Sequence, residues 1–528
     1  MGNNKYNHHK YSGHKYNGHK YSGKKNLVND NKLIEMTHLT NQNDISKYHC
    51  KYSNKDNKYW GIGIENECYL QCDPIVISGA SIIKRLGRER YSIDYRKNYN
   101  MVDINELIEK YYSKTINYKI YQMINAHSLD KMDRNGQHKT TYEKIPKLNS
   151  KFIGKTILEE WFEYDPEMKN IIDAHIKTRT NIFFDGDTIE FITDDFYKTN
   201  SKLAVKELKD TKDLFINKFN KFKKDTKLWE GTDDITFVTK HPGLNVMKSQ
   251  PNTIVLFNNT TYHLHITLPT EIYNGIIIDN NDFDTRHMKA IRLIQWFEPL
   301  FLVTLSSPDL FGILSDNYTK GSMRCTLSRY IGIGTYDTNQ KIKQKILVAP
   351  IKDIRPKNVI WWRDMVEKNL KYNLPMVDIG LDFNYAKHYQ SGFEFRLLDG
   401  FPIDCMKDVI DCILLICCHA LSFDKLSDMM IAQENQTWND LVYSTITKGY
   451  NATITKSQIN ELCTIFNIKI DNDCDMLLEN FYFILLEELF DKYHNNTLLE
   501  QMTQDFTKIN RWKNFNKVQF LEHINTLM

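Results

Sequence analysis

The chain has 528 residues, of which 41% are hydrophobic and 26% are charged, and its mean hydropathy is −0.51. This balance allows a buried core and argues against a membrane protein, because even the longest apolar run, Cys412 to Phe423, is shorter than the ~20 residues of a membrane-spanning helix. Lysine and arginine (69) exceed aspartate and glutamate (66) by only three, so the net charge gives no reason to expect a nucleic-acid partner.

Residues 1–50 are expected to form a disordered tail and linker. A five-residue unit, His-Lys-Tyr-Ser/Asn-Gly, occurs three times, at His9–Gly13, His14–Gly18 and His19–Gly23. A glycine in each unit and almost no aliphatic side chain leave too little apolar surface to offset the entropy of ordering. Two alternatives stay open for this tail: its histidines could bind a transition metal, and its lysines and tyrosines could contact RNA or another phosphate-rich surface.

From about Trp60 the pattern changes to short strands with some helical periods, and after Pro402 it becomes mainly helical. We therefore predict an α+β fold, with a main domain at 51–402 and an α-helical C-terminal region at 403–528. The predicted strands lie near 60–70, 181–193, 253–257, 262–268 and 392–399. The predicted helices lie near 103–113, 200–223, 286–305, 403–422, 424–433 and 456–466, and an amphipathic segment follows at 475–493.

The ten cysteines lack the paired spacing of a zinc site. The densest group, Cys405, Cys412, Cys417 and Cys418, lies in an apolar helical run, so we predict buried thiols rather than a reactive or metal-binding group at Cys417-Cys418-His419. Unpaired thiols indicate a reducing compartment. Because the N-terminus has no apolar signal-peptide core, we expect a cytoplasmic location.

The segment Gly61 to Cys68 alternates in the way of a β-strand, so Glu65 and Glu67 project to the same side. Ile62 and Ile64 project to the opposite side, as packing against a core requires. A strand with a solvated acidic face would show the same pattern. This segment alone therefore does not establish a binding site.

The same design recurs in other predicted strands. His263 and His265 share one side of their strand, and Glu394 and Arg396 share one side of theirs, each against apolar neighbours. A lone histidine pair is commonly structural, and a lone Glu-x-Arg is commonly a surface ion pair. The strand at 181–193 adds Glu190 and, as a candidate, Asp187. The recurrence across four segments predicts one shared site.

Carboxylates gathered on such a site would repel one another unless cations neutralise them. Carboxylate oxygens suit Mg²⁺ or Mn²⁺, and Mg²⁺ commonly completes its shell with substrate phosphates. Arg396 offers a planar pair of donors for a phosphoryl group or a substrate carboxylate. The residues therefore predict divalent metal and a nucleotide.

Four motifs follow one another along the chain: Gly-Ile-Glu-Asn-Glu at 63–67, Ile-Glu-Phe-Ile-Thr at 189–193, His-Leu-His at 263–265 and Phe-Glu-Phe-Arg at 393–396. In type and order they resemble the glutamine synthetase and glutamate-cysteine ligase superfamily of carboxylate-amine ligases, or amidoligases, over roughly residues 58–402. The resemblance implies a glutamine-synthetase-like catalytic domain, in which a mainly antiparallel curved sheet lines the active site and helices cover its other face. It also implies ATP and two ions of Mg²⁺ or Mn²⁺. The implied metal ligands are Glu67 and Glu190 for one ion, with Asp187 as a helper, and Glu65, His263 and Glu394 for the other.

The same resemblance implies roles for the remaining residues. His265 would contact an ATP phosphate, and Arg396 would stabilise the transferred phosphoryl group. Arg324 and Arg329 would hold a substrate carboxylate or phosphate, although surface solvation or helix capping explains these two arginines equally well. Tyr262 stands where the family often has a small residue, so the shape of the nucleotide pocket is expected to differ.

The implied activity is the formation of an amide or peptide-like bond through an acyl phosphate. The expected partners are a small-molecule carboxylate and amine, or a protein or peptide acceptor. We expect nucleic acid to bind weakly at most, through the tail, and no membrane partner, while an oligomer is compatible with the sequence. Two alternatives remain: a phosphagen-kinase-like phosphotransferase on the same fold, and a catalytically inactive scaffold or interaction protein.

Overall fold

The structure is a computed structural model, and the predicted tail, most of the predicted helix at 103–113 and the residues after 493 lie outside its described part. The described residues are 59–68, 70–81, 92–93, 102–103, 114–115, 117–124, 149–152, 157–172, 181–185, 188–193, 198, 201–228, 236–237, 245–247, 254–255, 261–270, 272–273, 276–277, 279–305, 383–385, 392–401, 403–432, 435–471 and 474–493.

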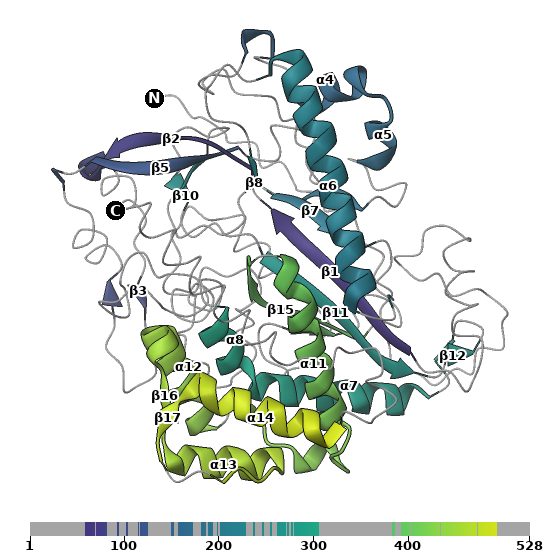
Figure 1. The fold of residues 1–528 in the computed structure, drawn as a ribbon, viewed down its shortest axis with the longest axis vertical. Coiled ribbons are helices and arrows are strands. Elements are labelled where there is room, and N and C mark those ends of the chain that lie inside the picture. Colours follow the sequence, from purple (N-terminus) through teal and green to yellow (C-terminus); the bar gives the residue numbers. More distant parts are fainter. Residues whose placement is uncertain are drawn as a thin grey trace, which may run out of the picture.

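A six-stranded antiparallel sheet forms the centre of the described structure, which has an α+β fold with an open sheet (Figure 1). All of its neighbouring strands pair antiparallel. In spatial order the strands are β14 (Phe383–Tyr385), β15 (Phe393–Asp399), β11 (Thr261–Thr270), β1 (Tyr59–Cys68), β7 (Thr188–Ile192) and β6 (Ile182–Asp185).

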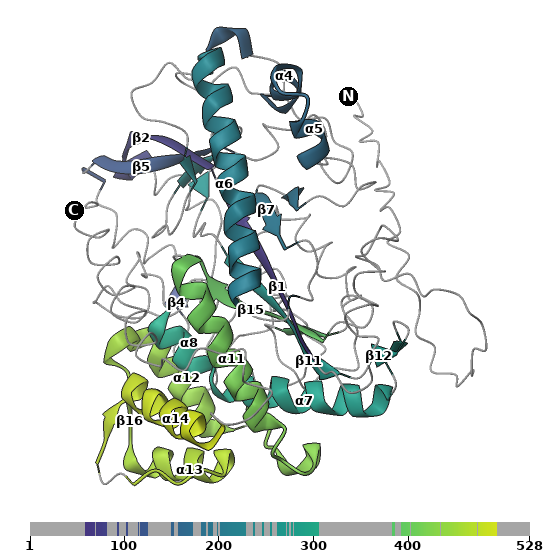
Figure 2. The same cartoon turned by 45° about the vertical axis from the view of Figure 1, so that its right-hand side comes forward.

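Helices cover one face of this sheet. The long helix α6 (Ser201–Thr226) contacts β1 and β7, α7 (Asn280–Trp296) contacts β11, and α8 (Glu298–Thr304) contacts β15. Helix α11 (Met406–Ala420) packs against both α6 and α7. Figures 1 and 2 show α6 running beside β1, and α7 and α11 lying near β11.

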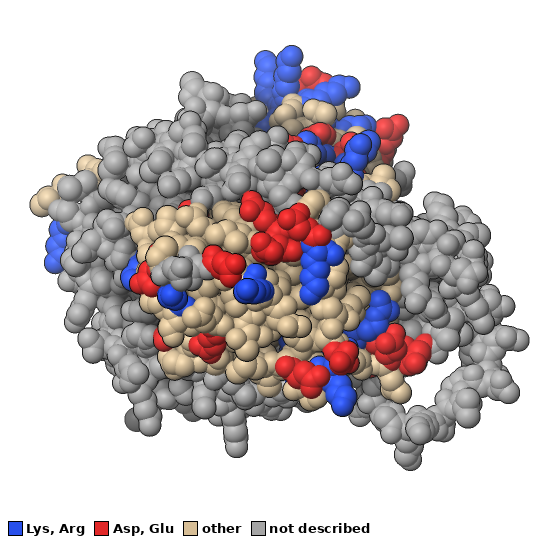
Figure 3. Space-filling view, turned by 60° about the horizontal axis from the view of Figure 1, so that its bottom comes forward, with Lys and Arg blue, Asp and Glu red and all other residues tan. Residues whose placement is uncertain are grey.

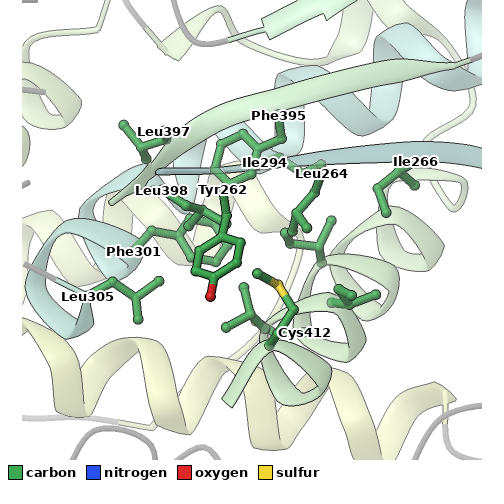
Figure 4. Packing of buried hydrophobic residues seen from close by; sticks show 14 of the residues in the cluster. Tyr262, Leu264, Ile266, Ile294, Phe301, Leu305, Phe395, Leu397, Leu398 and Cys412 are labelled. Atoms are coloured by element: carbon green, nitrogen blue, oxygen red, sulfur yellow. The ribbon is translucent and has the colours of Figure 1, made fainter. Parts of the chain in front are cut away.

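The core lies between the sheet and these helices because alternate strand residues are apolar and point to the helical side. From β11 this side receives Tyr262, Leu264 and Ile266, and from β15 it receives Phe395. Figure 4 shows these side chains packed with Cys412 and other apolar residues from the helices. The hydrophobic pattern of the predicted strands is therefore confirmed.

A second sheet has the order β10 (Ile254–Val255), β9 (Asn245–Met247), β5 (Asn117–Ile124), β2 (Leu70–Ser78) and β8 (Thr236–Phe237). Strands β5 and β9 pair in parallel, and the other neighbours pair antiparallel. Three two-stranded ladders complete the described strands: β3 (Ser92–Ile93) with β4 (Val102–Asp103), β12 (Ile272–Tyr273) with β13 (Ile276–Ile277), and β16 (Thr453–Ile454) with β17 (Met476–Leu477).

The described residues after Pro402 form mainly helices, as predicted. They comprise the 3₁₀ turn Ile403–Cys405, α11, α12 (Gln436–Lys448), the 3₁₀ turn Gly449–Asn451, α13 (Lys456–Phe466) and α14 (Leu478–Tyr493). Helix α13 begins with a capping box made by Thr455 and Gln458. Two short helices, α4 (Ile157–Tyr164) and α5 (Met168–Ile171), and the 3₁₀ turn Ser150–Phe152 precede the hairpin of β6 and β7.

The C-terminal helices pack directly on the helices that cover the sheet. Helix α12 contacts α8, and α14 contacts both α8 and α11. The indole Nε1 of Trp438 donates to the carbonyl of Gln295 at 2.7 Å, and the hydroxyl of Tyr482 donates to the carbonyl of Trp296 at 2.5 Å. The surface around α13 and α14 carries basic and acidic side chains side by side (Figure 3). Among the described residues, no helix combines the length and the apolar character needed to cross a membrane.

Three predicted elements need correction. The strand predicted at 181–193 is a hairpin of two strands, β6 and β7, in which Asp185 pairs with Thr188. The helix predicted at 286–305 is two helices, and it begins earlier because the Asp279 side chain caps α7 by accepting from two backbone amides. The break falls at Phe297, since Pro299 in the first turn of α8 has no amide hydrogen for a continuous helix.

The helix predicted at 424–433 is wrong: the described residues of this segment contain no α-helix, and Leu426–Asp428 forms a 3₁₀ turn. Three side chains from one side of α7 donate to backbone carbonyls of this segment, which occupies those carbonyls without a helix. The bonds run from Lys289 to Phe423 and Asp424, from Arg292 to Leu426 and Met429, and from Trp296 to Met430.

The prediction of buried thiols at Cys405, Cys412, Cys417 and Cys418 is confirmed, since all four are free and buried. Burial raises the pKa of the Cys418 thiol to about 12. The neighbouring His419 is a core histidine whose Nδ1 bonds to the hydroxyl of Tyr493 and whose Nε2 bonds to a backbone carbonyl. The four cysteines and His419 therefore have the burial and the contacts of core residues.

Candidate metal centre

Seven polar side chains selected from the sequence lie on four neighbouring strands of the six-stranded sheet. The strands run side by side in the order β15, β11, β1 and β7. The residues are Glu394 and Arg396 on β15, His263 and His265 on β11, Glu65 and Glu67 on β1, and Glu190 on β7.

The strand register places these residues opposite one another. Glu65 pairs with His263, Glu67 pairs with Glu190, and His265 pairs with Glu394. Paired residues on neighbouring strands project to the same face of a sheet. This face is opposite to the one that carries Ile64 and Leu264, so the four strand motifs converge on one acidic surface, here called the acidic face.

A bulge interrupts the alternation of β15 directly after Arg396. Between the pairs Tyr262–Leu398 and Leu264–Phe395, β15 has one residue more than β11. The extra residue allows both Leu397 and Leu398 to enter the core, where each is almost fully buried. Without the extra residue, strict alternation would turn Leu398 to the acidic face.

Glu65 connects the two histidines. Its Oε2 lies 3.1 Å from Nδ1 of His263, and its Oε1 lies 2.9 Å from Nε2 of His265. In the metal-free protein an ionised carboxylate only accepts hydrogen bonds, so both of these ring nitrogens carry the hydrogen there, and a bound metal ion would displace it. Glu65 therefore fixes the tautomer and the ring orientation of both imidazoles.

His263 consequently has a bare nitrogen on its other side. Burial lowers the pKa of His263, the Arg396 guanidinium lowers it further, and Glu67, Glu65 and Glu394 oppose these effects. In the neutral ring with hydrogen on Nδ1, Nε2 is a lone-pair donor. Within the described part of the chain, this buried Nε2 has no hydrogen-bond partner. Pairing with a carboxylate is how proteins orient imidazoles that bind metals.

A second group of ligand atoms lies beside it. One ligand atom each from Glu65, His265 and Glu394 lies within 4.8 Å of the others, and all three residues are buried. Nδ1 of His263 lies 3.6 Å from Oε1 of Glu394, so the two histidines share this centre. The structure thus groups His265 with the two carboxylates, whereas the family resemblance gives that position to His263.

Among the seven residues of the acidic face, Arg396 carries the positive charge. Its Nη1 lies 2.5 Å from Oε1 of Glu394, and both side chains are buried. One guanidinium faces four carboxylates, while burial favours the neutral form of His263. The carboxylate oxygens and imidazole nitrogens gathered on this face are ligand atoms suited to divalent cations.

Glu67 and Glu190 form the more open end of the acidic face. The side chain of Glu67 is 24% exposed and Glu190 is 8% exposed. The hydroxyl of Thr261 donates to Oε2 of Glu67 at 3.1 Å. Thr261 is a site residue that the sequence analysis missed, although its position two residues before His263 continues the same alternation.

Three further candidate residues, Asp187, Arg324 and Arg329, lie outside the described residues, so the structure does not place them relative to the acidic face.

Comparison with known proteins yields one extensive match. The chain is 35% identical over 497 residues to "Uncharacterized protein R704" of Acanthamoeba polyphaga mimivirus, and the match covers 91% of this chain and 84% of that protein. No protein-family model matches the chain.

Proposed function

The chain belongs to the same family as this mimivirus protein, and we propose that it is an ATP- and magnesium-dependent carboxylate-amine ligase. The observation that carries the proposal is the convergence of ligand atoms from Glu65, His265 and Glu394 within 4.8 Å on a buried sheet face. Buried carboxylates need compensation by cations. Their arrangement, with the motif order along the chain, supports a metal-dependent nucleotide site.

The donor set fits divalent cations. Carboxylate oxygens suit Mg²⁺ and Mn²⁺, and the imidazole nitrogens favour Mn²⁺ as a substitute. We propose one ion at Glu65, Glu394 and the histidines, and a second at the pair of Glu67 and Glu190. Bound cations of this kind would neutralise nucleotide phosphates as well as the acidic face.

The two histidines have different roles in this proposal. His263 turns Nδ1 toward Oε2 of Glu65 and Oε1 of Glu394, at 3.1 and 3.6 Å, and this nitrogen would bind the ion after giving up its hydrogen. His265 either completes the metal shell, as its place in the ligand group supports, or contacts an ATP phosphate. Arg396 is held by Glu394 and would orient its remaining guanidinium hydrogens toward the transferred phosphoryl group.

The proposed reaction needs no enzyme nucleophile. A carboxylate oxygen of the substrate forms a bond to the γ-phosphorus of ATP as the bond to the bridging oxygen breaks, which gives an acyl phosphate and ADP. An amine then attacks the acyl carbon, loses a proton and displaces inorganic phosphate. The protein contributes positioning and charge stabilisation, the usual basis of phosphoryl-transfer catalysis.

The finer features of the fold and location are part of the same proposal. An antiparallel sheet with helices on one face and ligand residues on the other supports a glutamine-synthetase-like catalytic domain at 51–402. We propose that the helical region at 403–528 supports this domain, that Arg324 and Arg329 bind substrate, and that the protein acts in the cytoplasm.

An assay of ATP turnover tests the function. Purified protein is incubated with ATP, Mg²⁺ or Mn²⁺, and a panel of amino acids paired with amines or peptides, and its products are identified by mass spectrometry. ADP, phosphate and an amide support the ligase, whereas ADP and a phosphorylated acceptor support a phosphagen-kinase-like enzyme. Glu394→Gln should abolish turnover, and Glu487→Gln on the exposed surface of α14 should not. Absence of Mg²⁺-nucleotide binding by the wild type would support a scaffold.

A further inference from the structure

A lysine from the helical side of the sheet reaches the strand that carries the two acidic-face glutamates. Lys212 of α6 places Nζ 2.7 Å from Oδ1 of Asn66 on β1. The same Nζ lies 5.8 Å from the ring centroid of Phe191 and 6.0 Å from that of Phe237. Lys212 is partly buried at this apolar layer and also interacts with the thiol of Cys68, so its ammonium group is held by two neighbouring polar groups of β1.

The side-chain amide of Asn66 accepts this hydrogen bond from Lys212. It stands between Glu65 and Glu67 in sequence, points to the opposite face and is 0% exposed. Its Oδ1 also accepts from the thiol of Cys68 at 3.1 Å. Because two donors converge on Oδ1, the amide is held in one orientation, with Nδ2 turned away from Lys212.

That orientation directs Nδ2 to the neighbouring strand. Nδ2 of Asn66 donates to the backbone carbonyl of Thr261 at 3.0 Å. Thr261 is the first residue of β11, and its own hydroxyl donates to Oε2 of Glu67 at 3.1 Å. A continuous path of hydrogen bonds therefore runs from α6, through the sheet, to a carboxylate of the acidic face.

We propose that Lys212 and Asn66 are positioning residues that hold the Thr261 end of β11 against β1 and thereby set the carboxylate of Glu67 for metal binding. This inference rests on the proposed function, because it assigns a purpose to the Glu67 end of the same site. Groups that orient metal ligands from the outer shell commonly contribute 10- to 100-fold to metal affinity.

The sign of the effect separates positioning from simple electrostatics. Removing a positive charge behind an acidic face would strengthen cation binding if Lys212 acted only through its field. Loss of positioning would weaken it. Lys212→Met removes the ammonium group and keeps an apolar stem, and Lys209→Met, one helical turn away in a surface pair with Asp404, is the matched control.

The experiment measures Mn²⁺ affinity by electron paramagnetic resonance for the full-length wild type, both lysine variants, Lys212→Arg and Asn66→Asp, with thermal unfolding as a check of folding. Asn66→Asp keeps an oxygen for Lys212 but removes the donor to Thr261. We expect about 10-fold weaker binding for Lys212→Met and Asn66→Asp, recovery in Lys212→Arg, and wild-type affinity in Lys209→Met.

Each alternative result has a distinct meaning. Wild-type protein that does not bind Mn²⁺ overturns the proposed metal site and this inference with it. Wild-type protein that binds, together with Lys212→Met of equal or tighter affinity, overturns the positioning role alone. If Lys212→Met does not fold, Asn66→Asp decides, and unchanged affinity in that variant overturns the role.

Discussion

The substitution Glu65→Gln should remove metal binding at the group of Glu65, His265 and Glu394 while the protein stays folded. Glu65 accepts from both histidines and contributes to the group of three ligand residues. Glutamine has nearly the same size, but its amide group presents hydrogens to one of two imidazole N–H groups and carries no charge. The variant should therefore lose both a metal ligand and the control of one histidine ring.

In the metal-free protein, Glu65→Gln has two opposing effects on the free energy of unfolding: it removes a repulsion between carboxylates and it loses a hydrogen bond. The ligand oxygens of Glu65 and Glu394 lie within 4.8 Å, and at this separation their repulsion is about 3.5 kcal/mol with an effective dielectric constant of ~20. Its removal offsets the loss of one buried hydrogen bond, which costs about 1 to 3 kcal/mol. The free energy of unfolding without metal should change by no more than about 2.5 kcal/mol.

The assay is thermal unfolding across a titration of Mn²⁺. Binding at 100 times the dissociation constant stabilises the folded state by about 2.7 kcal/mol. With an unfolding entropy of about 2.1 cal/mol/K per residue, the 528-residue chain should gain about 2.5 °C in Tm. We expect this gain for the wild type and for the surface control Glu487→Gln, and a clearly smaller gain for Glu65→Gln, which keeps only the proposed ion at Glu67 and Glu190. An equal gain in Glu65→Gln, or none in the wild type, would refute the reasoning.

Three further predictions concern stability, each measured by urea unfolding. Gly392→Ala should cost about 3 kcal/mol by overpacking, because its Cβ would lie 2.2 Å from a backbone oxygen of β11 and 2.5 Å from Cδ2 of His287; an unchanged midpoint would contradict this. Burial lowers the pKa of His287 to about 3 and that of His419 to about 4. As the pH falls, the unfolded chain, whose histidines have pKa values of about 6.5, therefore binds protons before the folded chain does. The free energy of unfolding has its full value above pH ~6.5 and falls by about 2.7 kcal/mol per pH unit between pH ~6 and ~4. A flat profile over this interval would show that these rings are not buried as described. Arg396→Met should cost about 3 kcal/mol without metal, since it removes the guanidinium from the buried Glu394, and Mn²⁺ should recover much of the loss; a loss that Mn²⁺ does not change would contradict the cation balance.

The strand faces could be predicted from the sequence because alternation is a local property. Glu65 and Glu67, and likewise His263 and His265, needed only the period of two residues to be placed on one side of their strands. The pairing that brings Glu65 opposite His263 joins residues far apart in sequence, and no local pattern determines such a register. The recurrence of polar pairs on four predicted strands suggested this convergence, and the family resemblance agreed with it.

The missed elements have identifiable causes. Strand β2 contains Asp73-Pro74, a pair typical of a turn, and the structure accommodates it at a register shift between Cys72 and Ile75. Helix α12 contains several β-branched and aromatic residues, which favour strands, and it is helical because Asn435 caps it and Trp438 is anchored in the core. Both are cases in which tertiary contacts override local preference.

The acidic face depends on the opposite face of the same sheet. Its carboxylates repel one another, so their mutual interaction cannot hold β1, β7, β11 and β15 in register. The apolar residues on the other side can, since burying each large side chain contributes about 1.5 to 3 kcal/mol. A slip of one residue in β11 would move both histidines into the core and expose Leu264 and Ile266. The hydrophobic pattern therefore determines the geometry of the charged site, and substitutions that disturb this core should disturb metal binding before they unfold the chain.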